Sequence, residues 1–212
     1  DYINNKKGVD SVLNVRVKEC APFENVYTLA LRGLHDRAMN ASNDMGDRKD
    51  MLQEALMAQR QMLIDAIGKP GEEIPQAFTP YKEVLDVYDE GLELPDDVTI
   101  IWPDDNYGYM KRLSSPKEQK RSGRSGVYYH SSYLGKPHDH LWMNTVSPTL
   151  MYEELRKAYD ATADRIWLLN AGDIKSCEFA VDYFLTMAFD IDAFNFERAA
   201  NYRTEWLCGM LG

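Results

Sequence analysis

The sequence predicts an α/β fold built on a parallel sheet, from two observations. The first is a repeated order along the chain, in which a short β-branched or aromatic run is followed by a polar loop and then by a segment with helical periodicity. The second is the length of 212 residues, which suits one domain but falls short of the ~250 residues usual for a closed (β/α)8 barrel. The five runs that predict strands lie at residues 25–31, 74–79, 98–102, 126–130 and 165–169.

Helices are expected between and after these runs. Residues 48–67 carry an apolar stripe at helical spacing and end before Gly68, a residue type common at helix C-termini. Ser147 followed by Pro148 is typical of a helix start and opens a helix through about residue 159. The remaining helices are predicted at residues 83–92, 178–189 and 195–210, with the boundary at 190–193 left open.

The charge balance restricts the partners. The chain holds 24 basic and 34 acidic residues, for a net charge of −10. No basic face is available to neutralise a phosphate backbone, so neither nucleic acid nor an anionic membrane surface is expected as a partner. No apolar run approaches the ~18 residues that span a bilayer. An anionic ligand must therefore be bound by a local cation.

The three cysteines predict no disulfide framework and no zinc site. Cys20, Cys177 and Cys208 are an odd set without a CxxC spacing. We expect all three to be small core residues.

Polar or aromatic side chains follow every predicted strand. In parallel α/β folds the loops after the carboxyl ends of the strands open on one face, where reactive groups gather. Five such endings in register predict a ligand site. The residues concerned are Arg32 and Asp36 after the first run, Tyr81 and Glu83 after the second, Asp104, Asp105 and Asn106 after the third, His130 and Tyr133 after the fourth, and Asn170 after the fifth.

The clustered carboxylates predict acid–base chemistry. Carboxylates that share a site push their pKa values apart, so one can remain a protonated acid while another serves as base. Glycoside hydrolysis needs this arrangement, together with aromatic faces that stack on sugar rings. Arg32, four residues before Asp36, is either a structural salt-bridge partner or a bidentate clamp on a substrate carboxylate. The residues alone do not favour either of these two roles of Arg32.

A metal-dependent hydrolase is the competing interpretation. His130, His138 and His140 lie within eleven residues and, with Asp104, resemble a divalent-metal ligand set. An HxH pair in a polar loop is more often a surface or substrate-lining feature, and neither HExxH nor CxxC accompanies it. No metal is therefore expected. A third interpretation is a catalytically silent carbohydrate-binding or structural fragment.

The loops carry a specific family resemblance. The sequence closely resembles glycoside hydrolase family 115 over about residues 20–190. The matching segments are WPDDNYGY at 102–109, Arg112-Leu113, 121–123, GVYYH at 126–130, Tyr133, Trp142 and RIWLLNAGDIK at 165–175, with 24–28, Arg32-Gly33, Asp36, 74–76 and 81–84 before them. Departures are Pro103, Leu169, Ala171 and the Leu34-His35 pair, which alter packing or loop shape.

The resemblance implies a catalytic (β/α)8-like barrel within a longer multidomain chain. Residues 1–212 would be the later part of that single barrel domain, a partial TIM-like barrel of about five βα units. The family contains inverting α-glucuronidases that remove glucuronic acid or its 4-O-methyl form from xylan. Because the earlier strands would lie elsewhere, we expect no activity from this piece alone.

The resemblance also implies roles for the residues at the strand ends. Glu83 is expected to be the acid, and Asp36 or Asp104 the base. Arg32 would bind the uronic carboxylate. The implied partner is glucuronoxylan, with no cofactor, a secreted, periplasmic or cell-surface location, and homo-oligomerisation left open. The other residues expected to contact the sugar are Tyr81, Asp105, Asn106, His130, Tyr133 and Asn170.

Overall fold

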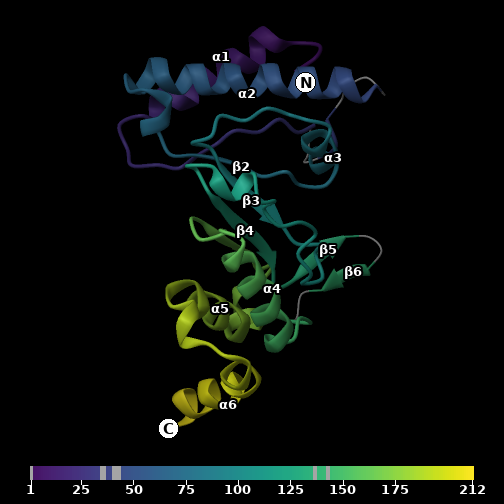
Figure 1. Cartoon of the computed structure of the whole chain (residues 1–212), viewed down its shortest axis with the longest axis vertical. Helices are drawn as coiled ribbons and strands as arrows, with labels where there is room; N and C mark the ends of the chain where they lie inside the picture. Colours follow the sequence, from purple (N-terminus) through teal and green to yellow (C-terminus); the bar gives the residue numbers. More distant parts are fainter. Residues whose placement is uncertain (1, 34–36, 40–43, 136–137, 142–143) are drawn as a thin grey trace. The chain divides into compact units, whose positions relative to one another are not determined.

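The computed structural model describes residues 2–33, 37–39, 44–135, 138–141 and 144–212. Five of its strands form one sheet in the order β1-β2-β3-β4-β7, and β5 and β6 form a second, two-stranded sheet. The β1–β2, β2–β3 and β4–β7 pairs are parallel, while β5 and β6 are antiparallel. Helices alternate with the parallel strands (Figure 1), so the predicted α/β class with about five βα units is confirmed.

Each predicted strand run overlaps one strand of the five-stranded sheet. The strands at the two edges are short: β1 has two residues, and β7 has four. The central strand β3 is buried along its whole length. The bounds are β1 Tyr27–Thr28, β2 Gln76–Phe78, β3 Thr99–Pro103, β4 Ser125–His130, β7 Trp167–Asn170, β5 Tyr133–Gly135 and β6 His138–Leu141.

The predicted helices are present, and α1 is additional. Gly68 ends α2 with a φ of 73°, as expected of a C-terminal glycine, and Ser147 precedes α4 with Pro148 at its first position. No helix within the described ranges is long and apolar enough to cross a membrane. The bounds are α1 Lys6–Cys20, α2 Met45–Ile67, α3 Glu83–Asp89, α4 Pro148–Asp160, α5 Ile174–Phe189 and α6 Phe196–Leu211, with short helices η2 Gly71–Glu73, η3 Glu118–Lys120 and η4 Ile191–Ala193.

The chain forms two compact units, each with its own core. Unit 1 comprises Asp1–Ile100 with Arg121–Gly123, and unit 2 comprises Ile101–Lys120 with Arg124–Gly212. Within unit 1, α1 lies along α2 (Figure 1). The apolar stripe of α2 packs on the sheet side of this unit, where the core includes Leu52, Leu56, Leu63, Phe78 and Val98.

The core of unit 2 lies on the face of β4 that carries Tyr129. Tyr129 of that strand is fully buried, and its ring lies 6.3 Å from that of Phe184 on α5. Met151 and Leu155 of α4 belong to the same core. Alternation along a strand places Tyr128 and His130 on the opposite face from Tyr129, which separates the core side of β4 from the candidate site.

The prediction that all cysteines are core residues is wrong for two of them. Cys177 is buried, whereas Cys20 and Cys208 are exposed. Cys20 is the last residue of α1, a helix without a single buried residue, and Cys208 lies in the final turns of α6. Residue type alone therefore misplaced the two cysteines that lie near helix C-termini.

Replacing Gly126 by alanine is expected to destabilise unit 2 strongly. A Cβ at this position would lie 2.0 Å from the carbonyl oxygen of Ile166, which accepts the Val127 N–H at 2.9 Å. Backbone must move to admit the methyl group, so we expect a loss of about 2–3 kcal/mol. Gly209→Ala is the matched control, since a Cβ there meets nothing within 4 Å. Urea denaturation of both variants measures the difference; equal unfolding free energies would contradict this close approach.

Candidate active site

The predicted site residues that the structure describes form two groups, one in each unit. Arg32, Tyr81 and Glu83 form the first group, in unit 1. Arg32 lies in the loop after β1, and Glu83 is the first residue of α3. Residues of this kind follow the carboxyl ends of parallel strands, as the sequence predicted. Asp36, the other predicted carboxylate of this unit, lies outside the described residues.

Glu83 is held by two donors. Its Oε2 accepts from Arg32 Nη1 at 3.3 Å, and its Oε1 accepts from the backbone N–H of Met39 at 3.3 Å. Arg32 Nη1 also donates to the carbonyl oxygen of Tyr81 at 3.4 Å. Both ionic side chains are about one-fifth exposed, at 19% for Arg32 and 21% for Glu83, so they remain within reach of a ligand. Arg32 is thus a salt-bridge partner, and its role as a substrate clamp stays a prediction.

Two cations flank the Tyr81 ring. The guanidinium carbon of Arg32 lies 5.8 Å from the ring centroid, and the ammonium of Lys82 lies 5.0 Å from it. Lys82 has φ 53° and ψ −124°, a backbone conformation that costs a non-glycine residue on the order of 1–3 kcal/mol. The strained residue stands directly before Glu83 and sets the direction in which α3 begins. Sequence reasoning did not single out Lys82, because nothing local marks a strained backbone at a lysine.

Asp104 and His130 form the centre of the second group, in unit 2. Asp104 is 1% exposed and His130 is 2% exposed. Asp104 Oδ1 lies 2.6 Å from His130 Nδ1, and Oδ2 accepts from the His130 backbone N–H at 3.1 Å. This contact and the backbone bond fix the orientation of the His130 ring against Asp104.

The loop after β3 wraps around the Asp104 carboxylate. Asn106, with φ 73°, donates its backbone N–H to Asp104 Oδ1 at 3.0 Å. Asp105 Oδ1 accepts the backbone N–H groups of Tyr107 at 2.8 Å and Tyr109 at 3.1 Å. Asp104 therefore has three donors within the chain, which suits an orienting carboxylate. Asp105 holds the loop, and contact of Asp105 or Asn106 with sugar stays a prediction.

Tyrosines surround the His130 imidazole. The ring of Tyr128 lies 4.7 Å from it, and that of Tyr133 lies 5.8 Å from it in an edge-on arrangement. On the core side of the strand, Tyr129 donates its hydroxyl to the carbonyl oxygen of Gly108 at 2.8 Å. Burial, and then the negative charge of Asp104, raises the pKa of Tyr129, so its hydroxyl stays a donor.

Asn170 joins this group from β7. Its side-chain Nδ2 donates to the Tyr128 hydroxyl at 2.7 Å. The register pairs His130 with Asn170 and Tyr128 with Leu168, so the amide reaches its partner diagonally across the strand pair. Sequence reasoning missed Tyr128, although its spacing of two from His130 on a strand was a signal that the two side chains share a face.

The metal interpretation gains no structural support. His138 and His140 lie in β6, and only their backbone is described. His130 Nδ1 is bound to Asp104. Across the described ranges, no three His, Cys, Asp or Glu side chains are grouped so that they could hold a metal ion.

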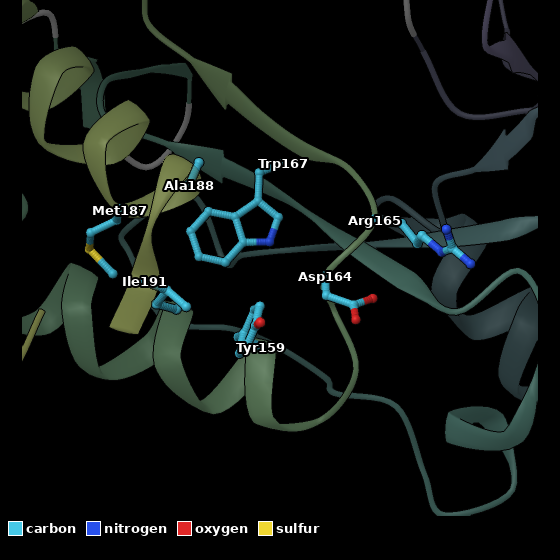
Figure 2. A pocket seen from close by; sticks show the side chains of 7 residues that line it. All are labelled: Tyr159, Asp164, Arg165, Trp167, Met187, Ala188 and Ile191. Atoms are coloured by element: carbon cyan, nitrogen blue, oxygen red, sulfur yellow. The ribbon is translucent and has the colours of Figure 1, made fainter. Parts of the chain in front are cut away.

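A hollow of about 180 Å³ lies elsewhere in unit 2, beside the amino end of β7 (Figure 2). Asn170, by contrast, stands at the carboxyl end of that strand. Two polar groups of the hollow are used within the protein, since Trp167 donates to the Ala163 carbonyl oxygen at 2.6 Å and Asp164 binds Arg124 at 2.6 Å. No predicted site residue lines it, so the two strand-end groups remain the candidate site.

Comparisons with known proteins identify the family of the chain. Residues 1–212 match the family model described as Glycosyl hydrolase family 115. A solved structure described as "A novel family GH115 4-O-Methyl-alpha-glucuronidase, BtGH115A, with specificity for decorated arabinogalactans" is 44% identical, with a TM-score of 0.87. The match covers 91% of this chain and 25% of that one, so the chain spans about a quarter of that protein's length. No curated protein matches. The chain belongs to glycosyl hydrolase family 115.

Proposed function

We propose that the protein carrying this chain is an inverting α-glucuronidase that releases glucuronic acid or its 4-O-methyl form from glucuronoxylan. The observation that carries the proposal is the Arg32–Glu83 pair beside the Tyr81 ring. A uronic acid is an anion, and a protein with a net charge of −10 needs a local cation to bind it. Arg32 supplies that cation next to a carboxyl group that can act on the glycosidic bond.

Arg32 would bind the substrate first, and Glu83 would then donate a proton. The substrate carboxylate takes over the guanidinium, which forms bidentate bonds with carboxylates. A second anion then stands beside Glu83, and like charges at close range favour the protonated acid. Glu83 donates its proton to the leaving glycosidic oxygen, while a second carboxylate activates water on the opposite face of the sugar. Asp36 or Asp104 supplies that second carboxylate in this proposal.

The substrate is a polysaccharide with uronic acid side groups. Family resemblance suggests xylan, and the solved relative is described as specific for decorated arabinogalactans. An enzyme acts on such a polysaccharide outside the cytoplasm, so we propose a secreted, periplasmic or cell-surface location. We also propose that residues 1–212 are the later part of one catalytic barrel domain and are inactive alone, so uronic acid release by the isolated chain would contradict this part.

Arg32→Met in the full-length protein tests the proposal. We expect kcat/KM for a uronosyl oligosaccharide to fall about 100-fold, equivalent to about 3 kcal/mol for a charged hydrogen-bonded contact. The neutral glucosyl analogue, which has no carboxylate, should lose little. Arg16→Met is the control, because Arg16 pairs with Glu19 on the exposed surface of α1. Equal losses on both substrates would contradict carboxylate binding by Arg32, and no uronic acid release by the wild type would contradict the function.

A further inference from the structure

The β4–β7 strand pair brings two side chains together that are 42 residues apart in the chain. His130 pairs with Asn170, and Tyr128 pairs with Leu168, in the parallel register. Residues two apart on a strand face the same side, so Tyr128, His130 and Asn170 share one face of this pair. The hydroxyl of Tyr128 is thereby placed 2.7 Å from Asn170 Nδ2.

That bond holds the Asn170 amide with its nitrogen end toward Tyr128. An amide carries two donor hydrogens on nitrogen and an acceptor oxygen, and either end can be presented by a flip of the group. Nδ2 donates to Tyr128. Asn170 Oδ1 has no hydrogen-bond partner among the described residues, and the backbone of Asn170 is held separately by the Ser131 N–H at 2.9 Å. In this arrangement Asn170 Oδ1 can accept a hydrogen bond from a ligand at the carboxyl end of β7.

The same tyrosine also borders the imidazole of His130. The two rings lie 4.7 Å apart at an angle of 55°. Asp104 holds the Nδ1 side of the imidazole, and Tyr128 covers one side of the ring. One residue thus contacts both the histidine and the asparagine that are expected to bind sugar.

We propose that Tyr128 is a positioning residue that fixes the orientation of the Asn170 amide and of the His130 ring. Its hydroxyl holds the Asn170 side chain in place, and in this arrangement Asn170 Oδ1 is left to accept from a sugar hydroxyl. This inference rests on the proposed function, because it gives Asn170 a substrate hydroxyl to bind.

Tyr128→Phe separates the hydroxyl from the ring. In the full-length protein we expect kcat/KM for a uronosyl oligosaccharide to fall about tenfold, mainly through KM, because the Asn170 amide loses the hydrogen bond that holds it. Tyr128→Leu, which also removes the ring, should in addition lower kcat. In the Asn170→Ala background, Tyr128→Phe should change kcat/KM less than twofold, since the group that it orients is absent.

Tyr183→Phe is the matched control, because it removes a hydroxyl that donates to the Pro148 carbonyl oxygen at 2.8 Å in the same unit. We expect it to lower the melting temperature without changing KM. Effects of Tyr128→Phe and Asn170→Ala that simply add, or a KM for Tyr128→Phe within twofold of the wild type, would overturn the inference.

A second measurement does not need activity. In a 15N-labelled protein, the Asn170 side-chain amide resonances should shift in Tyr128→Phe and stay unchanged in Tyr183→Phe. A wild type that releases no uronic acid would contradict the proposed function. The amide resonances would then still test whether Tyr128 positions the Asn170 amide. Unchanged Asn170 resonances in Tyr128→Phe would overturn it.

Discussion

Asp104→Asn is expected to lower kcat/KM about 1,000-fold, because it removes a proposed base, whose proton transfer contributes ~100- to 10,000-fold, and the carboxylate that holds the His130 ring. The asparagine has the same shape but no negative charge. Asp104 Oδ1 accepts from His130 Nδ1 at 2.6 Å in a site with almost no solvent exposure. Without the anion, the imidazole loses the carboxylate that holds it. The NH2 group of the asparagine can also be placed against the N–H groups that Asp104 binds, which is unfavourable.

Asp105→Asn is the control for this variant. Asp105 is the next residue in the same loop, and its Oδ1 accepts two backbone N–H groups. Its replacement should change kcat/KM less than about tenfold, because the asparagine Oδ1 can still accept the same two loop N–H groups. Steady-state kinetics with circular dichroism measures both variants. An Asp104→Asn protein that is folded and within tenfold of wild-type activity would contradict a catalytic role for the Asp104–His130 pair.

Glu83→Gln is expected to lower kcat on the natural oligosaccharide by about 1,000-fold and far less on an aryl uronoside. Proton transfer by a positioned acid contributes ~100- to 10,000-fold, and the sugar alkoxide is a poor leaving group without it. A nitrophenolate leaves without a proton, so the same variant should retain activity on that substrate within about tenfold. Glutamine keeps the shape of Glu83 next to Arg32 but cannot donate an acidic proton.

Glu90→Gln is the control for Glu83. Glu90 ends the same short helix and is exposed. It should leave both substrates unaffected. Equal losses of Glu83→Gln on the natural and the aryl substrate would mean that Glu83 binds or positions rather than protonates, and the acid would have to be another residue.

Local signals account for the elements that the sequence predicted correctly. Gly68 and the Ser147-Pro148 pair mark helix ends through their own backbone preferences, whatever lies around them. Helix α1 has no fully buried residue, but Val9, Leu13 and Val17 recur at helical spacing and are half-buried, a signal in the sequence that was not used. The antiparallel pairing of β5 with β6 is not visible in the composition of the chain.

The contacts within the candidate site could not be predicted from the sequence. Strand-end reasoning and family resemblance both selected Glu83, Asp104 and His130. The contacts join residues far apart in the chain: Arg32 and Glu83 are separated by 51 positions, and Asp104 and His130 by 26. Only the register of the strands brings such pairs together. For the same reason Tyr128 escaped notice, since its importance depends on Asn170 of another strand.

Proton NMR of the reaction in its first minutes shows whether uronic acid is released with inversion. The full-length protein is mixed with an α-linked uronosyl oligosaccharide, and the anomeric signal of the released acid is followed before mutarotation. An inverting acid–base pair predicts that the β-anomer of the free uronic acid appears first. Initial appearance of the α-anomer, or release of neutral sugar alone, would contradict the account.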